Sequence, residues 1–360
     1  MKNDLINNPS ILIAGDSFLD FYEKKEDPFK FIRQYFSKSD ILFFNLESPV
    51  TNEQTRADKS FPIKVSPENV KYLGNLSKNL VVAIANNHLL DCGEKGFNDT
   101  TRLLDESNID YIGSKEKKWI TLLYHNIKIA FLSYTEFGGK DYLSIIEPER
   151  ICDDISNIKK VSDFLIVSLH WGVENSHYPH PNQQKMAKNL IEAGADVVFG
   201  HHPHLIQGFE PYKNGLIFYS LGNFQFGTKF DISSSAYSYM VRLIINQNNP
   251  LNYEIIPIKI TAYTYPSLLK NEQAEKMKSF IREISDDLTT LNPVKFYRLA
   301  AGNFLNNSFK SWSTRLKQNW RKTIIPCLKT IVSPYYLKMY GGFIIGLLIR
   351  KKPDLIKKLE

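Results

Sequence analysis

Three histidines stand together in the segment Gly200-His201-His202-Pro203-His204, directly after the apolar residues Val197-Val198-Phe199. Two imidazoles that lie two residues apart at the end of a strand can face one cleft, because alternate residues of a strand point to the same side. Neutral imidazole is the commonest protein ligand for zinc, iron and manganese. The segment therefore predicts half of a metal site, with a histidine-rich surface loop and a structural zinc knuckle as the alternatives.

The remaining histidines and the cysteines narrow the kind of site. Six of the eight histidines lie between His170 and His204. Cys92, Cys152 and Cys327 are far apart and form no CxxC pair, whereas closed structural zinc sites usually recruit cysteines at short spacing. We therefore expect nitrogen and oxygen ligands, and a reducing compartment rather than a disulfide framework.

Short apolar runs alternate with helical stretches along the body of the chain, which is typical of an α/β fold with largely buried strands. The predicted strands are residues 11–14, 41–44, 80–85, 127–133, 164–169, 197–199, 216–220 and 251–263. The predicted helices are residues 28–36, 66–76, 93–106, 182–193 and 271–290, with Ser66 and Asn182 as caps of the second and fourth.

Side chains that can bind metal or move protons follow several of these strands. Asp16 comes after the first strand, Glu47 after the second, and Asn87 and His88 after the third. His170 and the histidine segment follow two later strands. Because the binding sites of α/β proteins collect at the carboxyl ends of strands, these side chains are expected to meet.

The order of these motifs resembles the bacterial capsule-synthesis protein family named CapA, which is associated with poly-γ-glutamate and other surface polymers. That family is similar in turn to the calcineurin-like metallophosphoesterases, which implies an α/β four-layer sandwich of two mixed β-sheets flanked by helices. The implied domain is residues 1–300, with a core at about 10–260. The motifs are Gly15-Asp16, Asn45-Leu46-Glu47, Ala85-Asn86-Asn87-His88 with Asp91 and Gly93 behind it, His170-Trp171-Gly172-Val173-Glu174, the histidine segment, and Ser220-Leu221-Gly222-Asn223-Phe224.

The resemblance implies a centre of two divalent metal ions, for which manganese, iron or zinc would be suitable. Glu47 takes the place of the bridging carboxylate. The other implied ligands are Asp16 and His204 for one ion, and Asn87, His170 and His202 for the other. Metallophosphoesterases usually have Asp-x-His and a bridging aspartate, whereas this chain has Asp16-Ser17-Phe18 and Glu47, so one histidine ligand is missing.

Further residues near these motifs have implied or open roles. His88 resembles the catalytic histidine that contacts the phosphate and protonates the leaving oxygen. His201 is expected to face away from its ligand neighbour. Glu174 either orients a ligating imidazole by accepting its ring proton or is an exposed loop acid, and Asn223 is placed to reach the centre. The loops at residues 136–149 and 175–181 are expected to set substrate specificity.

These residues imply a metal-dependent phosphoester hydrolase of surface-polymer biosynthesis, in which a hydroxide held by two metals attacks phosphorus. Its partner would be a phosphorylated small molecule or a surface-polymer intermediate. The alternatives are a non-catalytic metal-binding accessory protein of a polymer synthase, and a nuclease. His88 favours an enzyme, because a purely structural metal site would not require it.

The basic charge of the chain lies in residues 301–360, which hold 12 Lys and Arg against 2 Asp and Glu and leave 33 against 36 for the rest. Aromatic residues and the cluster Arg350-Lys351-Lys352 flank the apolar run 341–349, a pattern suited to an anionic membrane surface. A helical extension packed on the body is the alternative, while nucleic acid is disfavoured because no recognised motif accompanies the charge. Without a signal peptide or an apolar window of about 20 residues, we expect a cytoplasmic protein held at the inner face of the membrane.

Deletion of residues 301–360 should therefore move the protein from the membrane fraction to the soluble fraction, because its basic and aromatic anchor is lost. Cell fractionation with detection by immunoblot measures this. An unchanged distribution would contradict the anchoring role.

Overall fold

A computed structural model describes residues 8–300, apart from 21–25, 58, 60–61, 75, 227–234, 247–250, 262–263 and 298. The predictions for residues 301–360 lie outside this range and stay predictions. Within it, no helix is long and apolar enough to cross a membrane.

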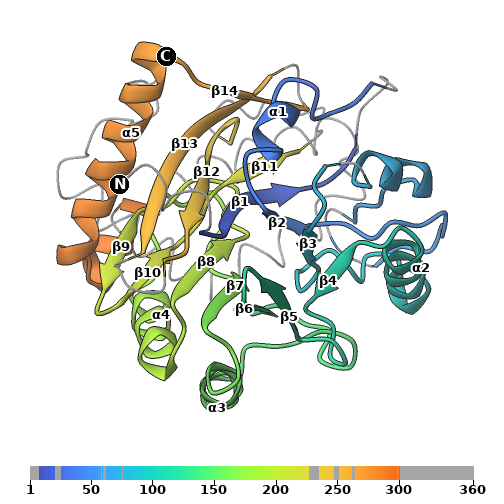
Figure 1. Ribbon diagram of the computed structural model, residues 1–360, viewed down its shortest axis with the longest axis horizontal. Helices are drawn as coiled ribbons and strands as arrows, with labels where there is room; N and C mark the ends of the chain where they lie inside the picture. The colour runs from blue at the N-terminus through green and yellow to red at the C-terminus, as the bar shows by residue number, and fades with distance from the viewer. Residues whose placement is uncertain are drawn as a thin grey trace, which may run out of the picture.

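Two mixed β-sheets form the centre of the molecule (Figure 1). The first has the strand order β14-β13-β12-β1-β2-β3-β4, with β11 paired to β1, and the second has the order β5-β6-β7-β8-β10-β9. Parallel pairs join β1, β2, β3 and β4 in the first sheet and β6, β7, β8 and β10 in the second.

The strands of the first sheet are β1 (Ser10–Ser17), β2 (Ile41–Leu46), β3 (Leu80–Ala83), β4 (Asp110–Ile112), β11 (Asn223–Gln225), β12 (Tyr237–Ile244), β13 (Asn252–Thr261) and β14 (Tyr265–Leu268). Those of the second are β5 (Trp119–Tyr124), β6 (Ile127–Thr135), β7 (Phe164–His170), β8 (Val197–His201), β9 (Phe209–Tyr212) and β10 (Gly215–Phe218). The helices are α1 (Arg33–Phe36), α2 (Gly93–Glu106), α3 (Pro148–Lys159), α4 (Pro181–Ala193) and α5 (Asn271–Asp286), with the 3₁₀ turns η2 (Pro67–Tyr72) and η3 (Asp287–Thr290).

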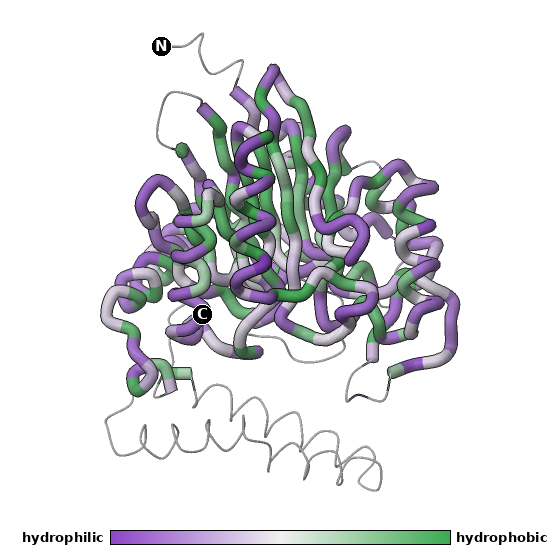
Figure 2. Tube along the Cα trace, turned by 90° about the horizontal axis from the view of Figure 1, so that it is seen from below, coloured by the Kyte–Doolittle hydropathy of each residue, from purple (hydrophilic) through white to green (hydrophobic). Residues whose placement is uncertain are grey.

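The strands carry apolar residues on both faces of each sheet. One face therefore packs against the other sheet, and the opposite face packs against helices. Phe43 of β2 stacks on Phe131 of β6 across the interface, with ring centroids 5.6 Å apart. The neighbours Leu42 and Phe44 point outward and are covered by α1, η2 and α2, while α3 and α4 cover the outer face of the second sheet. Helix α5 closes the inner core at one side, and the apolar strands lie inside more hydrophilic helices and loops (Figure 2). The predicted α/β fold with two mixed sheets is confirmed.

Several predicted element types and bounds were wrong. In the predicted helix 28–36 only α1 is α-helical, and residues 66–76 contain the 3₁₀ turn η2, for which Ser66 provides no side-chain cap. Over so few residues a period of 3.0 cannot be told from one of 3.6. The cap of α4 is His180, whose Nδ1 accepts from the backbone N–H of Asn182, the residue predicted to cap it. Helix α3 and the strands β4, β5, β9, β11, β12 and β14 were not predicted.

Two glycines, Gly15 and Gly200, allow another part of the backbone to approach closely. Each directly precedes a residue of the candidate site. A Cβ at Gly15, before Asp16, would lie 1.8 Å from the carbonyl oxygen of Gly222. A Cβ at Gly200, before His201, would lie 1.8 Å from the carbonyl oxygen of Tyr219. Any side chain at either position would displace the neighbouring backbone at Gly222 or Tyr219.

Gly200→Ala should lower the free energy of unfolding by about 3 kcal/mol, because the added methyl group clashes with backbone that cannot swing aside. Urea denaturation measures the loss. Gly138→Ala is the control and should be neutral, since a Cβ there meets nothing within 4 Å. Equal stability of the two variants would contradict the close-contact argument.

Candidate metal centre

The strand register gathers the predicted ligands at one end of both sheets. In the first sheet, Asp16 of β1 lies opposite Asn45 of β2 and Asn223 of β11. In the second sheet, His170 of β7 lies opposite His201 of β8. Because the parallel strands of both sheets end at the same edge, carboxylates and amides from one sheet face imidazoles from the other.

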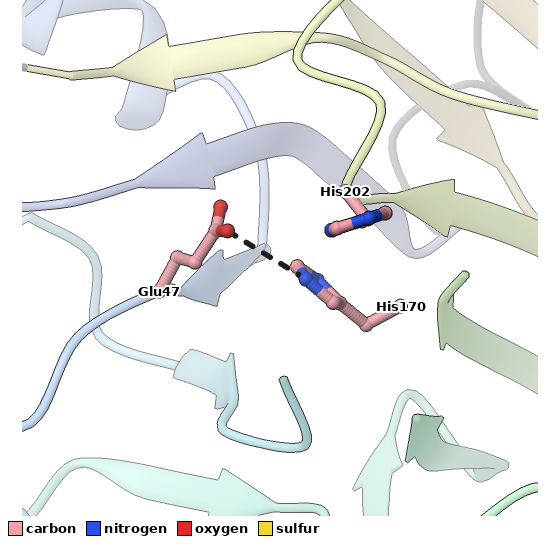
Figure 3. A group of neighbouring side chains, drawn as sticks. All are labelled: Glu47, His170 and His202. Atoms are coloured by element: carbon pink, nitrogen blue, oxygen red, sulfur yellow. Dashed lines mark ion pairs between the residues drawn. The ribbon is translucent and has the colours of Figure 1, made fainter. Parts of the chain in front are cut away.

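Two overlapping groups could each hold a cation. Glu47, His170 and His202 offer ligand atoms that all lie within 4.8 Å of one another, and so do Asp16, Glu47 and His204. The Oε1 atom of Glu47 is 3.6 Å from Nε2 of His170 and 3.8 Å from Nε2 of His204. Figure 3 shows the carboxylate of Glu47 directed toward the ring of His170, with His202 alongside. Glu47 is shared by the two groups, as the resemblance implies for a bridging ligand.

The Glu47 carboxylate is fully buried, and neither of its oxygens has a hydrogen-bond partner among the residues that the structure describes. Buried polar atoms are almost always paired, so an unpaired buried carboxylate requires an explanation. Burial raises the pKa of Glu47 well above its usual range, and the charges of Asp16 and the exposed Glu174 raise it further. A cation between these oxygens and the imidazoles would compensate the charge, so the side chains fit a metal centre.

The predicted ligand Asn87 also points to this place. Its Oδ1 lies 2.8 Å from Nε2 of His170, so the two predicted ligand atoms converge. Burial lowers the pKa of His202 to about 4 and that of His170 well below its ordinary value, and the neighbouring ring of His202 lowers the latter further. Both imidazoles are therefore neutral near pH 7, the form that binds metal.

The backbone of the histidine segment is strained where the ligands are. His202 has φ = 96° and His204 has φ = 58°, both in the left-handed region that favours glycine. Such conformations cost about 1–3 kcal/mol each and cluster at functional sites. The turn places the ring centroids of His202 and His204 6.2 Å apart. It directs His202 to the group that contains His170, and His204 to the group that contains Asp16.

The sequence did not identify Asn45, which connects ligands of both sheets. Its side-chain amide donates to Oδ1 of Asp16 at 2.8 Å and lies 3.3 Å from Nδ1 of His170. Asn45 therefore contacts the His170 ring. The sequence had offered Glu174 as a residue that orients a ligating imidazole. A usable signal was its place two residues before Glu47, on the same side of the chain at the end of β2.

His88 lies next to the proposed ligands without being in either group. Its Nε2 is 3.9 Å from Oε1 of Glu47, and its Nδ1 is 2.7 Å from Oδ2 of Asp91. Lys59 forms an ion pair with Asp91 and donates to the backbone oxygen of Asn87 at 2.8 Å. Burial lowers the pKa of His88, and the hydrogen bond to Asp91 opposes this shift. The ring is therefore held at Nδ1 and presents Nε2 to the centre.

Sequence comparison shows which family the chain belongs to. The family described as bacterial capsule synthesis protein PGA_cap matches residues 10–228, more than half of the chain. The chain belongs to this capsule synthesis family. It is 32% identical over 301 residues to the PGA biosynthesis protein CapA of Bacillus subtilis, covering 77% of this chain and 78% of that protein. It is also 32% identical over 253 residues to the capsule biosynthesis protein CapA of Bacillus anthracis, covering 64% and 61%.

Among solved structures, a novel phosphatase from Mycoplasma pneumoniae aligns with 70% of this capsule synthesis protein and 94% of its own chain. The sequence identity is 12% and the TM-score is 0.46.

Phe18, the residue at which the resemblance leaves a histidine ligand missing, packs among aromatic rings. The ring of Phe18 lies 5.3 Å from that of Phe226, which in turn lies 5.1 Å from the ring of His204. His201 is buried nearby, with Nδ1 3.2 Å from Oδ1 of Asp16. Burial alone would raise the pKa of Asp16, but the contact with His201 and its charge bring the pKa below its ordinary value. His201 therefore contacts the candidate ligand Asp16, although it belongs to neither of the two groups that could hold a cation.

Asn223 lies beside the ring of His204. Its Oδ1 lies 2.9 Å from Nδ1 of His204, which is the type of contact that fixes the tautomer of a ligating imidazole. With Nδ1 held by Asn223, Nε2 of His204 faces Glu47.

Glu47→Gln should stabilise the protein in chelator by about 1–3 kcal/mol, because it removes a buried charge with no hydrogen-bond partner. The same change should weaken manganese binding by roughly 100-fold or more, since the shared ligand is lost. Denaturation in chelator and calorimetric titration with manganese measure the two effects. Glu106→Gln on the exposed face of α2 should change neither, and a loss of stability in Glu47→Gln would show that the carboxylate has a structural partner.

Proposed function

We propose that this protein is a metal-dependent phosphoester hydrolase that acts on a phosphorylated intermediate of capsule or other cell-surface polymer synthesis. The observation that carries the proposal is the buried Glu47 carboxylate, which has no hydrogen-bond partner among the described residues and is shared by two groups of side chains that could each hold a cation. A shared carboxylate between two cation positions is the arrangement that two-metal phosphoester chemistry requires. Membership of the capsule synthesis family supports the biological setting.

Two divalent cations at this centre would supply an activated water and positive charge for the phosphoryl oxygens. The protein contributes rigid positioning of their ligands. Asp16 is held by Asn45 and by the backbone N–H of His202, which donates to its Oδ2 at 3.2 Å. Because these partners come from both sheets, the ligands are arranged before a substrate arrives, which is the condition for electrostatic catalysis.

His88 is the candidate proton donor to the leaving oxygen. Its Nδ1 is fixed beside Asp91 and its Nε2 faces the centre. An anionic phosphoester beside Nε2 would raise the pKa of the ring and so favour the protonated form that a general acid needs. Lys59 forms an ion pair with Asp91. This ion pair fixes the carboxylate that in turn fixes the ring of His88.

Metal analysis joined to a panel of phosphomonoesters and phosphodiesters tests the function directly. The wild type should contain divalent metal and hydrolyse at least one member of the panel, and His202→Ala should lose both. Metal without hydrolysis would favour the non-catalytic accessory role, and absence of both in the wild type would refute the proposal.

His88→Ala should lower kcat by about 10²- to 10⁴-fold while the metal content stays normal, because His88 moves a proton and is not a ligand. Steady-state kinetics and elemental analysis of the same preparation provide the measurement. His125→Asn is the control, since this exposed histidine lies in the β5–β6 turn at φ = 49°, a conformation that asparagine tolerates. A loss of metal in His88→Ala would make His88 a ligand or a structural residue.

A further inference from the structure

A groove of about 1050 Å³ lies beside the metal centre, separated from it by Phe137. The Phe137 ring lies 4.1 Å from the ring of His202 and 5.9 Å from that of His170, and the same residue lines the groove. Volumes of this order hold ligands much larger than a phosphate ion. A substrate with its phosphorus at the centre could therefore extend past Phe137 into the groove.

The charge of the groove does not suit a polyanion. Its lining includes one carboxylate, Glu136, and one ammonium group, Lys185, whose charges oppose each other. The start of α4 also lines it but offers no free backbone donor among its first residues, because Pro181 has none and His180 accepts from the next two backbone N–H groups. Within the described part of the lining, an anion would thus meet neither a basic cluster nor an open helix terminus.

Hydrogen-bonding groups of the lining are mostly uncharged amides. Gln183 is only 6% exposed, and its Oε1 accepts from the backbone N–H of His180 at 2.8 Å, which fixes the orientation of the amide. Its Nε2 is buried beside Gly172, so this amide shapes the wall of the groove and does not offer it a donor. Asn182 and Asn189 on α4 add both donors and acceptors.

Aromatic rings complete the lining. Tyr297 and Phe296 lie beside the ring of His180, at centroid distances of 6.0 and 4.9 Å, and line the groove together with Phe137. A sugar presents apolar C–H faces that pack on such rings and hydroxyl groups that pair with amides. A charged oligomer would have to desolvate its charges against these rings without compensation.

We propose that the groove between α4 and the loop after β6 binds an uncharged saccharide, the group that carries the phosphoester. This inference rests on the proposed function for the role of the saccharide as substrate, but binding itself does not depend on hydrolysis. Both loops expected to set specificity contribute, through Glu136, Phe137 and His180.

Calorimetric titration of the full chain in chelator tests the groove without any turnover. The probes are two neutral hexasaccharides, maltohexaose and the hexamer of N-acetylglucosamine, with hexaglutamate as the anionic comparator. At least one neutral probe should bind, and Tyr297→Ala and Asn189→Ala should each weaken it at least tenfold. Tyr297→Phe keeps the ring and should bind normally, as should Asn214→Ala in a separate pocket.

Failure of both neutral probes to bind at millimolar concentration would overturn the saccharide assignment, as would hexaglutamate binding that Lys185→Ala abolishes. If the saccharide binds but no phosphoester is hydrolysed, the groove stands and the proposed function fails. If hydrolysis of sugar phosphoesters is found and Tyr297→Ala leaves both KM and binding unchanged, the function stands and the groove proposal fails.

Discussion

The face-to-face packing of the two sheets sets the distance between the acidic and imidazole halves of the metal centre. Asp16 and Glu47 stand at the ends of strands in one sheet, and His170 at the end of a strand in the other. Stacked rings such as Phe43 and Phe131 keep these sheets in register below the site. Since a shift of one residue along a strand would turn every side chain to the opposite face, the apolar core also decides which polar residues meet.

The same region contains several unfavourable local features. A carboxylate is buried without a hydrogen-bond partner among the described residues, and His202 adopts a left-handed backbone. Each feature costs about 1–3 kcal/mol, so the apolar core must offset them. A site arranged only for stability would pair the carboxylate and relax the turn. The strain is therefore evidence that ligand geometry, and not folding free energy, determined these residues.

The sequence predicted the α/β class and the convergence of the ligand candidates, because strand ends carry a clear pattern of apolar run followed by polar residue. It did not reveal Asn45 as a link between the sheets, since an asparagine at a strand end has the same local pattern whether it turns the chain or holds a ligand. Lys59 lies in a loop without periodicity, and only the folded chain brings it to Asp91. The cap at His180 was misplaced by two residues because asparagine is the commoner cap.

The division of the candidate ligands between two sheets also determines whether folding or cation binding comes first in the newly made chain. Asp16 and His204 belong to one group although most of the described chain separates them, so this group cannot exist until β8 has docked on the second sheet and that sheet on the first. Local segments such as the β1–β2 unit hold acids without imidazoles and offer a cation little selectivity. The complete set of candidate ligands is therefore available to a cation only after both sheets have folded and docked.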